Sequence, residues 1–336
     1  MTDPTFTPDD SSILITGGTG SFGRHFVKTV LENHRPRRLI VFSRDELKQY
    51  EMAQVFSSEQ YPFLRYFIGD VRDEARLEMA MRDVDCVVHT AALKHVPVAE
   101  YNPFECIHTN VMGTENVVRA AIHNGVARVI GLSTDKACNP INLYGASKLA
   151  SDKILIAANN ISGHDGTRFS VVRYGNVLGS RGSVLPLFLK LRDAGADHLP
   201  ITDPRMTRFW ITLQQGVDFV LTSLATMRGG EIFVPKIPSM RVTDLATAVA
   251  PELPHKVVGI RPGEKLHEVL LSEDDARTTL DMADRYIIQP AFRFWTSQHL
   301  DGQGAKPVAE GFRFASDTND AWLDPDSLAR AMAEDA

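Results

Sequence analysis

The sequence lacks most features of secreted and membrane-spanning proteins. Its 336 residues include three cysteines without CxxC spacing, a pattern typical of a reducing compartment rather than of a disulfide framework. No run of about 18 apolar residues occurs, and the N-terminal MTDPTFTPDD lacks the apolar segment of a signal peptide. We therefore expect a soluble, cytoplasmic protein with no membrane partner.

Positive charge and paired histidines are also scarce. The formal net charge of −6 provides no general attraction to phosphate backbones, so we expect no nucleic-acid partner. His267–Glu268 matches part of a zinc-binding helix motif, but no second histidine follows four residues later. We therefore expect no metal site.

Short apolar runs alternate with helix-length segments in the first half of the chain. The runs that we expect to be strands are Ser12–Thr16, Arg38–Ser43, Leu64–Ile68, Asp85–Thr90, Arg128–Ser133 and Phe169–Arg173. Phe22–Glu32 and Pro103–His123 are two of the helical segments between them. With 43% hydrophobic residues to form a core, this alternation predicts an α/β protein with a doubly wound parallel sheet, the Rossmann arrangement.

The alternation loosens after about residue 175, where glycine, proline and arginine become frequent. We interpret residues 1–175 as the Rossmann domain and residues 176–336 mainly as a smaller C-terminal substrate-binding lobe, with some chain returning to the first domain. Polar, glycine-containing sequence over Thr296–Asp320 predicts a loop or lid, and Pro325–Met332 a short final helix.

A glycine-rich loop, TGGTGSFG, lies between the first strand and the first helix. Its GxxGxxG pattern lets the backbone approach a pyrophosphate, while the helix N-terminus, which Ser21 would help to cap, offers unpaired N–H groups. An empty tight turn is the alternative, but strand, loop and helix follow one another as dinucleotide binding requires. The predicted cofactor residues of the loop are Gly17, Thr19, Gly20, Ser21, Phe22 and Gly23.

The end of the second strand, VFSRDELK, bears on the choice of dinucleotide. Ser43, Arg44 and Lys48 favour the 2′-phosphate of NADP. Asp45 suits the ribose hydroxyls of NAD, so NAD stays open. The segments after the third and fourth strands are predicted to flank the rest of the cofactor with Asp70, Val71, Ala91, Ala92 and Lys94. For Lys94, a solvated loop lysine is the alternative.

Tyr144 and Lys148 lie four residues apart in STDKACNPINLYGASK, after the fifth predicted strand. On a helix such residues share one face. A nearby ammonium and the nicotinamide charge would lower the pKa of the tyrosine, whose phenolate accepts a hydroxyl proton as hydride leaves the same carbon. Thr134 is expected to hydrogen-bond that hydroxyl. Tyr144 and Lys148 are thus predicted as catalytic and as cofactor-binding residues.

On the glycine loop, the YxxxK pair, RYGNVLGSRG and RPGEKLHE, the chain resembles the extended short-chain dehydrogenase/reductase superfamily, in particular its nucleotide-sugar branch. Removal of a hydride from a sugar C4 does not require Asp135 or Lys136, and 4-epimerisation does not require them either. Once C4 is a ketone, however, the C5 proton is acidic and the C6 hydroxyl can leave, given a base and an acid. Two adjacent ionisable residues after a strand end could supply both.

The triplet Thr134-Asp135-Lys136 narrows this resemblance, since 4,6-dehydratases that retain the C5 configuration read Thr-Asp-Glu there. With SRDELK, AALKHVPVAEYNPFE, RFWIT and GGEIFVPKIPSM, it resembles the inverting UDP-N-acetylglucosamine 4,6-dehydratases of the pseudaminic acid pathway. The resemblance implies that Lys136 removes the C5 proton, that Asp135 protonates the departing C6 hydroxyl, and that bound NADP is regenerated in each turnover. An exposed ion pair in a turn is the alternative.

These roles require unusual protonation states. Lys136 has to be neutral, so burial beside the nicotinamide is expected to depress its pKa, and a protonated Asp135 would remove an opposing charge. The predicted catalytic residues are Thr134, Asp135, Lys136, Tyr144 and Lys148. A UDP-sugar 4-epimerase and a non-catalytic NADP-binding redox sensor are the competing interpretations, although a sensor does not need these residues.

The second lobe supplies the groups expected for a UDP-sugar, whose diphosphate suits arginine and whose ring edges and hydroxyls suit amides and carboxylates. The resemblance implies that Asn176 and Arg208 meet the diphosphate, and that Glu264 meets the uridine ribose. All residues expected for UDP-N-acetylglucosamine are Lys94, Asn176, Val184, Lys190, Arg205, Arg208, Arg261 and Glu264. A surface salt bridge is the alternative for each arginine. The resemblance also implies a homo-oligomer.

Overall fold

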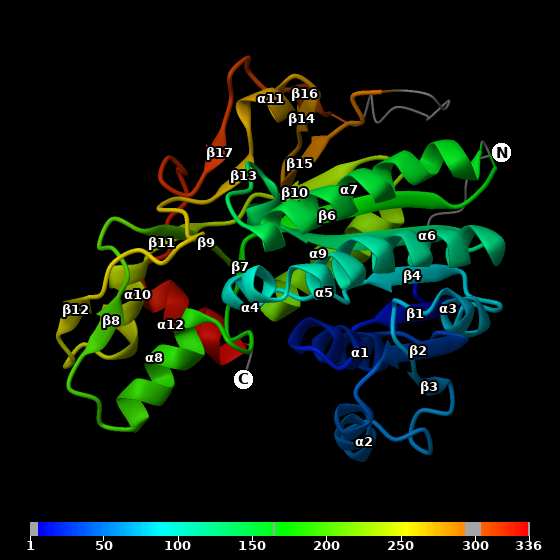
Figure 1. The fold of residues 1–336 in the computed structure, drawn as a ribbon, viewed down its shortest axis with the longest axis horizontal. Coiled ribbons are helices and arrows are strands. Elements are labelled where there is room, and N and C mark those ends of the chain that lie inside the picture. The colour runs from blue at the N-terminus through cyan, green and yellow to red at the C-terminus, as the bar shows by residue number, and fades with distance from the viewer. Residues whose placement is uncertain (1–5, 164, 293–303, 335–336) are drawn as a thin grey trace.

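A parallel sheet covered on both faces by helices forms the larger part of the protein (Figure 1). The computed structural model describes residues 6–163, 165–292 and 304–334. The strands of this sheet are β1 (Ser12–Thr16), β2 (Arg38–Ser43), β3 (Leu64–Ile68), β4 (Cys86–His89), β5 (Arg128–Thr134), β6 (Arg168–Tyr174), β10 (Ile232–Pro235), β14 (Thr279–Asp281), β15 (Arg285–Ile288) and β16 (Lys306–Pro307). Within the described residues they form a 10-stranded sheet in the order β16-β14-β15-β10-β6-β5-β4-β1-β2-β3.

In this sheet the consecutive strands β10, β6, β5, β4, β1, β2 and β3 pair in parallel, which confirms the predicted doubly wound α/β fold. Strands β1 to β6 begin and end within one residue of their predicted limits. Every residue of β1 and β4 is buried, as expected of parallel strands between two helical layers. Because the strand order reverses between β1 and β4, their carboxyl ends leave a crevice where parallel-sheet proteins bind ligands.

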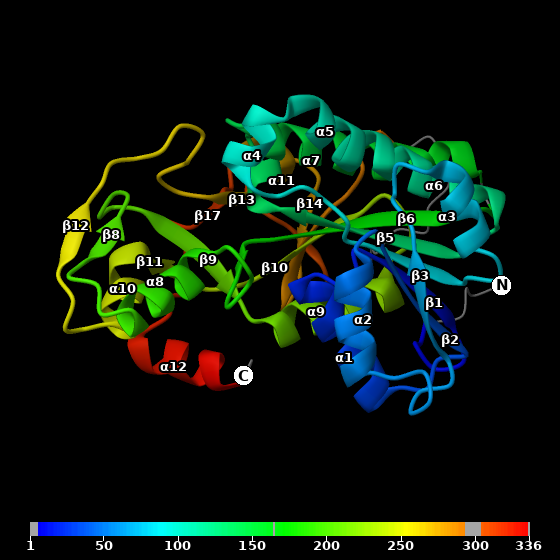
Figure 2. The ribbon, with the colours of Figure 1, turned by 60° about the horizontal axis from the view of Figure 1, so that its bottom comes forward.

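The two helical layers are visible in Figure 2, with α3 to α7 on one face and α1, α2 and α9 on the other. These helices are α1 (Ser21–Asn33), α2 (Glu46–Val55), α3 (Glu74–Ala80), α4 (Val96–Tyr101), α5 (Pro103–Ile107), α6 (Gly113–His123), α7 (Leu143–Ser162) and α9 (Leu213–Thr226). The predicted helix over Phe22–Glu32 is therefore confirmed as α1. The expected capping role of Ser21 was wrong, because Gly20 is the N-cap and Ser21 already lies in the first turn.

The helix predicted over Pro103–His123 is interrupted by a π-helical turn at His108–Met112. The wider turn buries Asn110, whose Oδ1 accepts a hydrogen bond from Leu93 N at 2.8 Å and whose Nδ2 donates to Ser147 Oγ at 2.9 Å. Asn110 thus ties the loop after β4 to helix α7. Such π-helical turns are frequent at functional sites, and this one faces the crevice.

The second lobe, at the left of Figure 1, has its own apolar core. It contains α8 (Val184–Asp193), β8 (Leu199–Ile201), α10 (Val242–Val249), β12 (His255–Val257) and α12 (Pro325–Glu334), the last close to the predicted final helix. Phe188, Trp210 and Leu245 are buried in this core. The lobe boundary at residue 175 remains a prediction, since β10 and β14 to β16 return to the main sheet.

Short strands connect the lobes. They are β7 (Asn176–Val177), β9 (Thr207–Ile211), β11 (Ser239–Arg241), β13 (Val269–Leu271) and β17 (Phe314–Ala315), with the one-turn helix α11 (Glu273–Ala276) after β13. The loop or lid predicted over Thr296–Asp320 lies partly outside the described residues, and its described part contains β16 and β17. None of the helices in the described part of the chain combines the length and apolar character that a bilayer-spanning segment needs.

Candidate active site

A cavity of about 670 Å³ opens at the carboxyl ends of the central strands. All of the cofactor residues predicted from the sequence line it, namely Gly17, Thr19, Gly20, Ser21, Phe22, Gly23, Ser43, Arg44, Lys48, Asp70, Val71, Ala91, Ala92, Lys94, Tyr144 and Lys148. Thr109, on the π-helical turn, also lines the cavity, and its buried hydroxyl has no hydrogen-bond partner in the described structure.

The glycine loop is shaped by close backbone approaches. Gly17 has φ +66°, and a Cβ there would lie 2.8 Å from Thr90 Oγ1 and 2.9 Å from Ala91 N. A Cβ on Gly23 would lie 2.5 Å from Gly18 Cα, so only glycine lets α1 pack this closely against the loop. The N-terminus of α1 consequently faces the cavity with no side-chain cap on its N–H groups, an arrangement suited to a diphosphate.

Charged pairs surround the cavity at the end of β2. Arg44 Nη1 lies 3.7 Å from Asp70 Oδ2, and Lys48 Nζ lies 3.0 Å from Asp45 Oδ2. Asp45 also caps α2 by accepting a hydrogen bond from Lys48 N. Both cations and the Asp45 carboxylate line the cavity, so groups suited to NADP and to NAD are present together.

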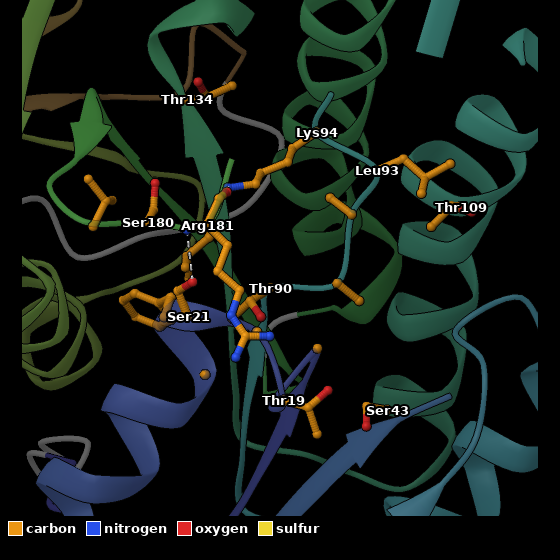
Figure 3. A pocket seen from close by; sticks show the side chains of 18 of the residues that line it. Thr19, Ser21, Ser43, Thr90, Leu93, Lys94, Thr109, Thr134, Ser180 and Arg181 are labelled. Atoms are coloured by element: carbon orange, nitrogen blue, oxygen red, sulfur yellow. Dashed lines mark hydrogen bonds between the residues drawn. The ribbon is translucent and has the colours of Figure 1, made fainter. Parts of the chain in front are cut away.

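The loop around Arg181 crosses the cavity mouth and was not recognised from the sequence. Arg181 N donates to Ser21 Oγ at 3.3 Å, and Lys94 Nζ donates to Arg181 O at 3.0 Å. In Figure 3 the Arg181 side chain points into the cavity, toward Thr90. This loop joins the start of α1 to the loop after β4. Its glycine-flanked arginine, in GSRGS, was the available sequence signal.

Asp135 and Lys136 lie on a single helical turn directly after β5. Thr134 Oγ1 donates to Asp135 Oδ1 at 2.9 Å, and Lys136 Nζ donates to the same oxygen at 3.0 Å. Asp135 is fully buried behind the cavity wall, whereas Lys136 lines the cavity. The alternative of an exposed ion pair in a turn is therefore wrong, because the carboxylate has no access to solvent.

Helix α7 begins beside this turn. Asn142 caps it by accepting a hydrogen bond from Gly145 N at 2.7 Å, which places Tyr144 in the first turn and Lys148 one turn later. A Cβ on Gly145 would collide with the backbone carbonyl of Lys136. The close approach allowed by Gly145 brings Tyr144, Lys148, Thr134 and Lys136 to one wall of the cavity.

Burial dominates the titration of the tyrosine and its helix partner. It raises the pKa of Tyr144 to about 12, although the charge of Lys136 acts in the opposite direction. Burial also lowers the pKa of Lys148, against the charge of Asp152. In the protein by itself the Tyr144 pKa is raised because the phenolate would lose its water shell. The lowering expected from the nicotinamide charge remains a prediction.

Lys136 contacts a second carboxylate that was considered in the sequence only as a metal ligand. Glu268 Oε1 lies 3.2 Å from Lys136 Nζ, and Glu268 is only 1% exposed. Burial alone would lower the pKa of Lys136, but the charges of Asp135 and Glu268 outweigh it and raise that pKa. In the protein without a nicotinamide the pKa of Lys136 is thus raised, chiefly by Asp135 and further by Glu268, which lies next to the apolar strand β13. The depression expected beside a bound nicotinamide remains a prediction.

The two carboxylates of this cluster shift in opposite directions. Burial and the charge of Glu268 raise the pKa of Asp135. Burial also favours a protonated Glu268, yet Lys136, Arg208 and Lys265 outweigh it and lower the pKa of Glu268. Relative to free carboxyl groups, the protonated form of Asp135 and the ionised form of Glu268 are therefore favoured, and Lys136 lies between them.

The residues predicted for the nucleotide sugar are only partly brought together. Lys94 and Asn176 line the cavity, whereas the others do not: Val184, Lys190, Arg205, Arg208, Arg261 and Glu264. Arg205 pairs with Asp203 at 2.8 Å. Arg208 is buried, and its guanidinium donates to Lys265 O at 3.0 Å. Their substrate contacts remain predictions.

The loop that carries Arg261 and Glu264 nevertheless docks beside the catalytic turn. Arg261 pairs with Glu264 within this loop. Asn142 Nδ2 donates to Gly263 O at 2.8 Å, and Lys265 Nζ donates to Cys138 O at 2.6 Å. Across the described ranges, no group of three or more His, Cys, Asp or Glu side chains could hold a metal ion.

Two proteins of known activity show extensive sequence similarity to this chain. The UDP-N-acetylglucosamine 4,6-dehydratase (inverting) of Campylobacter jejuni subsp. jejuni serotype O:2 is 58% identical over 322 residues, covering 94% of this chain and 96% of the relative. The UDP-glucose 4-epimerase of Rickettsia bellii is 44% identical over 307 residues, covering 89% of each chain. The dehydratase is thus the more similar of these two relatives.

Solved structures show the same architecture. Pen from Bacillus thuringiensis has a TM-score of 0.88 and 34% identity, covering 98% of this chain and 99% of that chain. DesIV, a dTDP-glucose 4,6-dehydratase from Streptomyces venezuelae with NAD bound, has a TM-score of 0.69 and 27% identity, covering 76% and 86%. A family of polysaccharide biosynthesis proteins matches residues 13–290. The chain therefore belongs to the polysaccharide biosynthesis protein family.

Proposed function

We propose that the protein is a UDP-N-acetylglucosamine 4,6-dehydratase that inverts C5, a hydro-lyase that uses a bound nicotinamide dinucleotide. The observation that carries the proposal is the Asp135–Lys136 pair, held 3.0 Å apart at the wall of a dinucleotide-type cavity beside Tyr144. The C. jejuni relative of that name supports the substrate and the inversion. The product is then the UDP-2-acetamido-2,6-dideoxy-L-arabino-hexos-4-ulose.

The cavity residues fit a dinucleotide. Gly17 and Gly23 leave the backbone open to a diphosphate, the α1 N-terminus presents N–H groups, and Thr109 has an unused hydroxyl. When bound, the nicotinamide accepts a hydride from C4 and later returns it to C6. We propose NADP, since Ser43, Arg44 and Lys48 line the cavity and would suit a 2′-phosphate. The NAD in DesIV and the presence of Asp45 keep NAD as the alternative.

Tyr144 is proposed to accept the proton of the C4 hydroxyl, with Thr134 and Lys148 orienting the phenol and the sugar. A pKa of about 12 means that Tyr144 is protonated in the free protein at neutral pH. A cationic ring beside Tyr144 would lower that pKa, so deprotonation is coupled to binding. Loss of the hydride then leaves a ketone at C4.

Lys136 is proposed to remove the C5 proton, and Asp135 to protonate the C6 hydroxyl as it leaves as water. The raised pKa of Asp135 supports its role as the acid. Its Oδ2 has no hydrogen-bond partner in the described structure, so this oxygen is available to carry the proton. A 4-epimerase needs neither group, and nor does a redox sensor, which makes the dehydratase the better explanation.

Further parts of the proposal rest on the resemblance. They are contacts of the diphosphate with Asn176 and Arg208, a contact of Arg261 on the phosphate side, and a contact of Glu264 with the uridine ribose. The resemblance also supports a homo-oligomeric and cytoplasmic enzyme, and a product used for pseudaminic acid or a related glycan. The Arg261–Glu264 pair would have to open or turn toward the ligand, because the two side chains now contact each other.

The test is incubation with UDP-N-acetylglucosamine in heavy water, followed by mass and proton NMR analysis. We expect loss of water, deuterium at C5 and inverted C5 configuration. Lys136→Met should keep cofactor binding but abolish deuterium incorporation at C5, because the C5 base is missing. Product of unchanged mass from the wild-type protein would instead indicate the 4-epimerase, and unchanged turnover of Lys136→Met would remove Lys136 from the mechanism.

A further inference from the structure

The charge cluster at the cavity wall holds one carboxylate more than the proposed chemistry uses. Lys136 Nζ lies 3.0 Å from Asp135 Oδ1 and 3.2 Å from Glu268 Oε1. Asp135 is fully buried and Glu268 is 1% exposed, so water has little access to either carboxylate. Lys136 therefore has two partners at hydrogen-bond distance with which it can exchange a proton.

Glu268 is fixed in this position by its surroundings. Its backbone N–H donates to Ser316 Oγ at 2.9 Å, and Ser316 N donates to the Glu268 carbonyl at 2.9 Å. Lys265 Nζ and Arg208 Nε each lie 3.8 Å from its carboxylate. Glu268 Oε2 has no hydrogen-bond partner in the part of the chain that the structure describes. Purely structural buried carboxylates usually have both oxygens satisfied.

We propose that Glu268 accepts the proton that Lys136 must lose before Lys136 can act as a base. This inference rests on the proposed function and assigns a positioning and proton-accepting role to a residue outside the Asp135–Lys136 pair. With Asp135 alone, one carboxylate would have to take the lysine proton and then donate it to the leaving group. With two carboxylates, Asp135 keeps its own proton and Glu268 takes that of Lys136.

The proton balance is closed within the cluster. A bound cationic nicotinamide would lower the pKa of Lys136. A proton then moves from Lys136 Nζ to Glu268 Oε1, so a neutral amine faces the substrate. Lys136 then takes the C5 proton, the C5 electron pair forms the double bond to C6, and the C6 hydroxyl leaves with the proton of Asp135 as water. The cluster ends as ionised Asp135, protonated Lys136 and protonated Glu268. Its net charge is zero before and after, which a buried site favours.

Charged groups face Glu268 from each neighbouring element. They are Asp135 and Lys136 on the turn after β5, Arg208 on β9 and Lys265 on its own loop. Arg208 and Lys265 favour the ionised form of Glu268, and burial together with the Glu268 charge favours the protonated form of Asp135. Removal of the Glu268 charge should therefore let Asp135 ionise at lower pH and pair permanently with Lys136.

The experiment uses the full chain with its cofactor, UDP-N-acetylglucosamine and the variants Glu268→Gln and Glu268→Asp. A single turnover follows C4 oxidation by nicotinamide absorbance and dehydration by product mass. For Glu268→Gln we expect C4 oxidation to persist while dehydration falls at least about tenfold, so that reduced cofactor accumulates. The high-pH limb of its dehydration profile should also move to lower pH, and Glu268→Asp should restore both properties.

The matched control is Glu231→Gln, at a carboxylate that is 4% exposed and accepts a hydrogen bond from Ser170 at 2.6 Å, far from the cavity lining. Glu231→Gln should lower thermal stability without changing the ratio of dehydration to C4 oxidation. Equal loss of both steps in Glu268→Gln, or an unchanged pH profile, would overturn the inference. If Glu268→Gln does not fold, Glu268→Asp alone decides. A folded Glu268→Asp that oxidises C4 but dehydrates slowly would overturn the inference, whereas a wild-type ratio of dehydration to C4 oxidation would support it. Failure of the wild type to release water contradicts the proposed function instead.

Discussion

Gly145 provides a direct test of how closely helix α7 must approach the catalytic turn. A Cβ at this position would lie 3.0 Å from the Lys136 carbonyl carbon, closer still to its oxygen, and 3.1 Å from Pro140 Cβ. The two closest atoms belong to the Lys136 backbone, and the third to the rigid ring of Pro140, so no side-chain rotation can make room. In Gly145→Ala either α7 or the turn that carries Asp135 and Lys136 has to move.

The expected cost follows from this geometry. Overpacking of a rigid site costs about 1–3 kcal/mol of unfolding free energy. A displacement on the order of 1 Å between reacting groups lowers rates about 100-fold. We therefore expect Gly145→Ala to lose about 100-fold in kcat for dehydration, with a smaller change in cofactor affinity, because the glycine loop is not displaced.

The assay compares kcat, cofactor binding and thermal unfolding in Gly145→Ala and Gly216→Ala. Gly216 lies within α9, and a Cβ there would meet nothing closer than Phe22 Cε2 at 3.7 Å, an ordinary contact. Alanine is the better helix former by about 1 kcal/mol, so the control should be as stable as the wild type or more stable. Wild-type kcat in Gly145→Ala would refute the claim that this close approach positions Lys136.

Two further predictions concern the cofactor loop and a buried histidine. Arg181→Ala should release the dinucleotide more readily during gel filtration, since a cation pointing into the cavity is lost. The control Arg119→Ala breaks an exposed pair with Glu115 and should retain the dinucleotide. Equal retention by the two variants would contradict the prediction. His89 contacts Thr16 and Thr114, and burial, aided by the charge of Lys148, lowers its pKa to about 3. Between about pH 6.5 and about pH 3 this histidine is therefore protonated in the unfolded chain but neutral in the folded protein. The unfolding free energy consequently falls as the pH is lowered through this range, by up to about 1.4 kcal/mol per pH unit. In urea unfolding, the free energy of unfolding should decrease less steeply with falling pH in His89→Gln than in the wild type. The same pH dependence in both proteins would show that His89 is not responsible.

Local patterns were sufficient for much of the fold. Strands β1, β2 and β4 to β6 could be located because parallel strands buried on both faces appear as short continuous apolar runs. The π-helical turn at His108–Met112 escaped notice, since the contacts of its Asn110 with Leu93 and Ser147 join segments that are remote along the chain. Ser21 was misplaced as a cap for a simpler reason, because helix limits are uncertain by a residue or two.

The sequence by itself determined the groups that lie close along the chain: the glycine loop, the Asp135–Lys136 pair after a strand end, and Tyr144 one helical turn before Lys148. Those spacings follow from strand, turn and helix geometry alone. Only the tertiary structure decided the surroundings of the pair, because Glu268 comes from a remote loop and adds to the effect of Asp135 in raising the pKa of Lys136. Charge interactions in a buried site depend on distance in space, which spacing along the chain does not reveal.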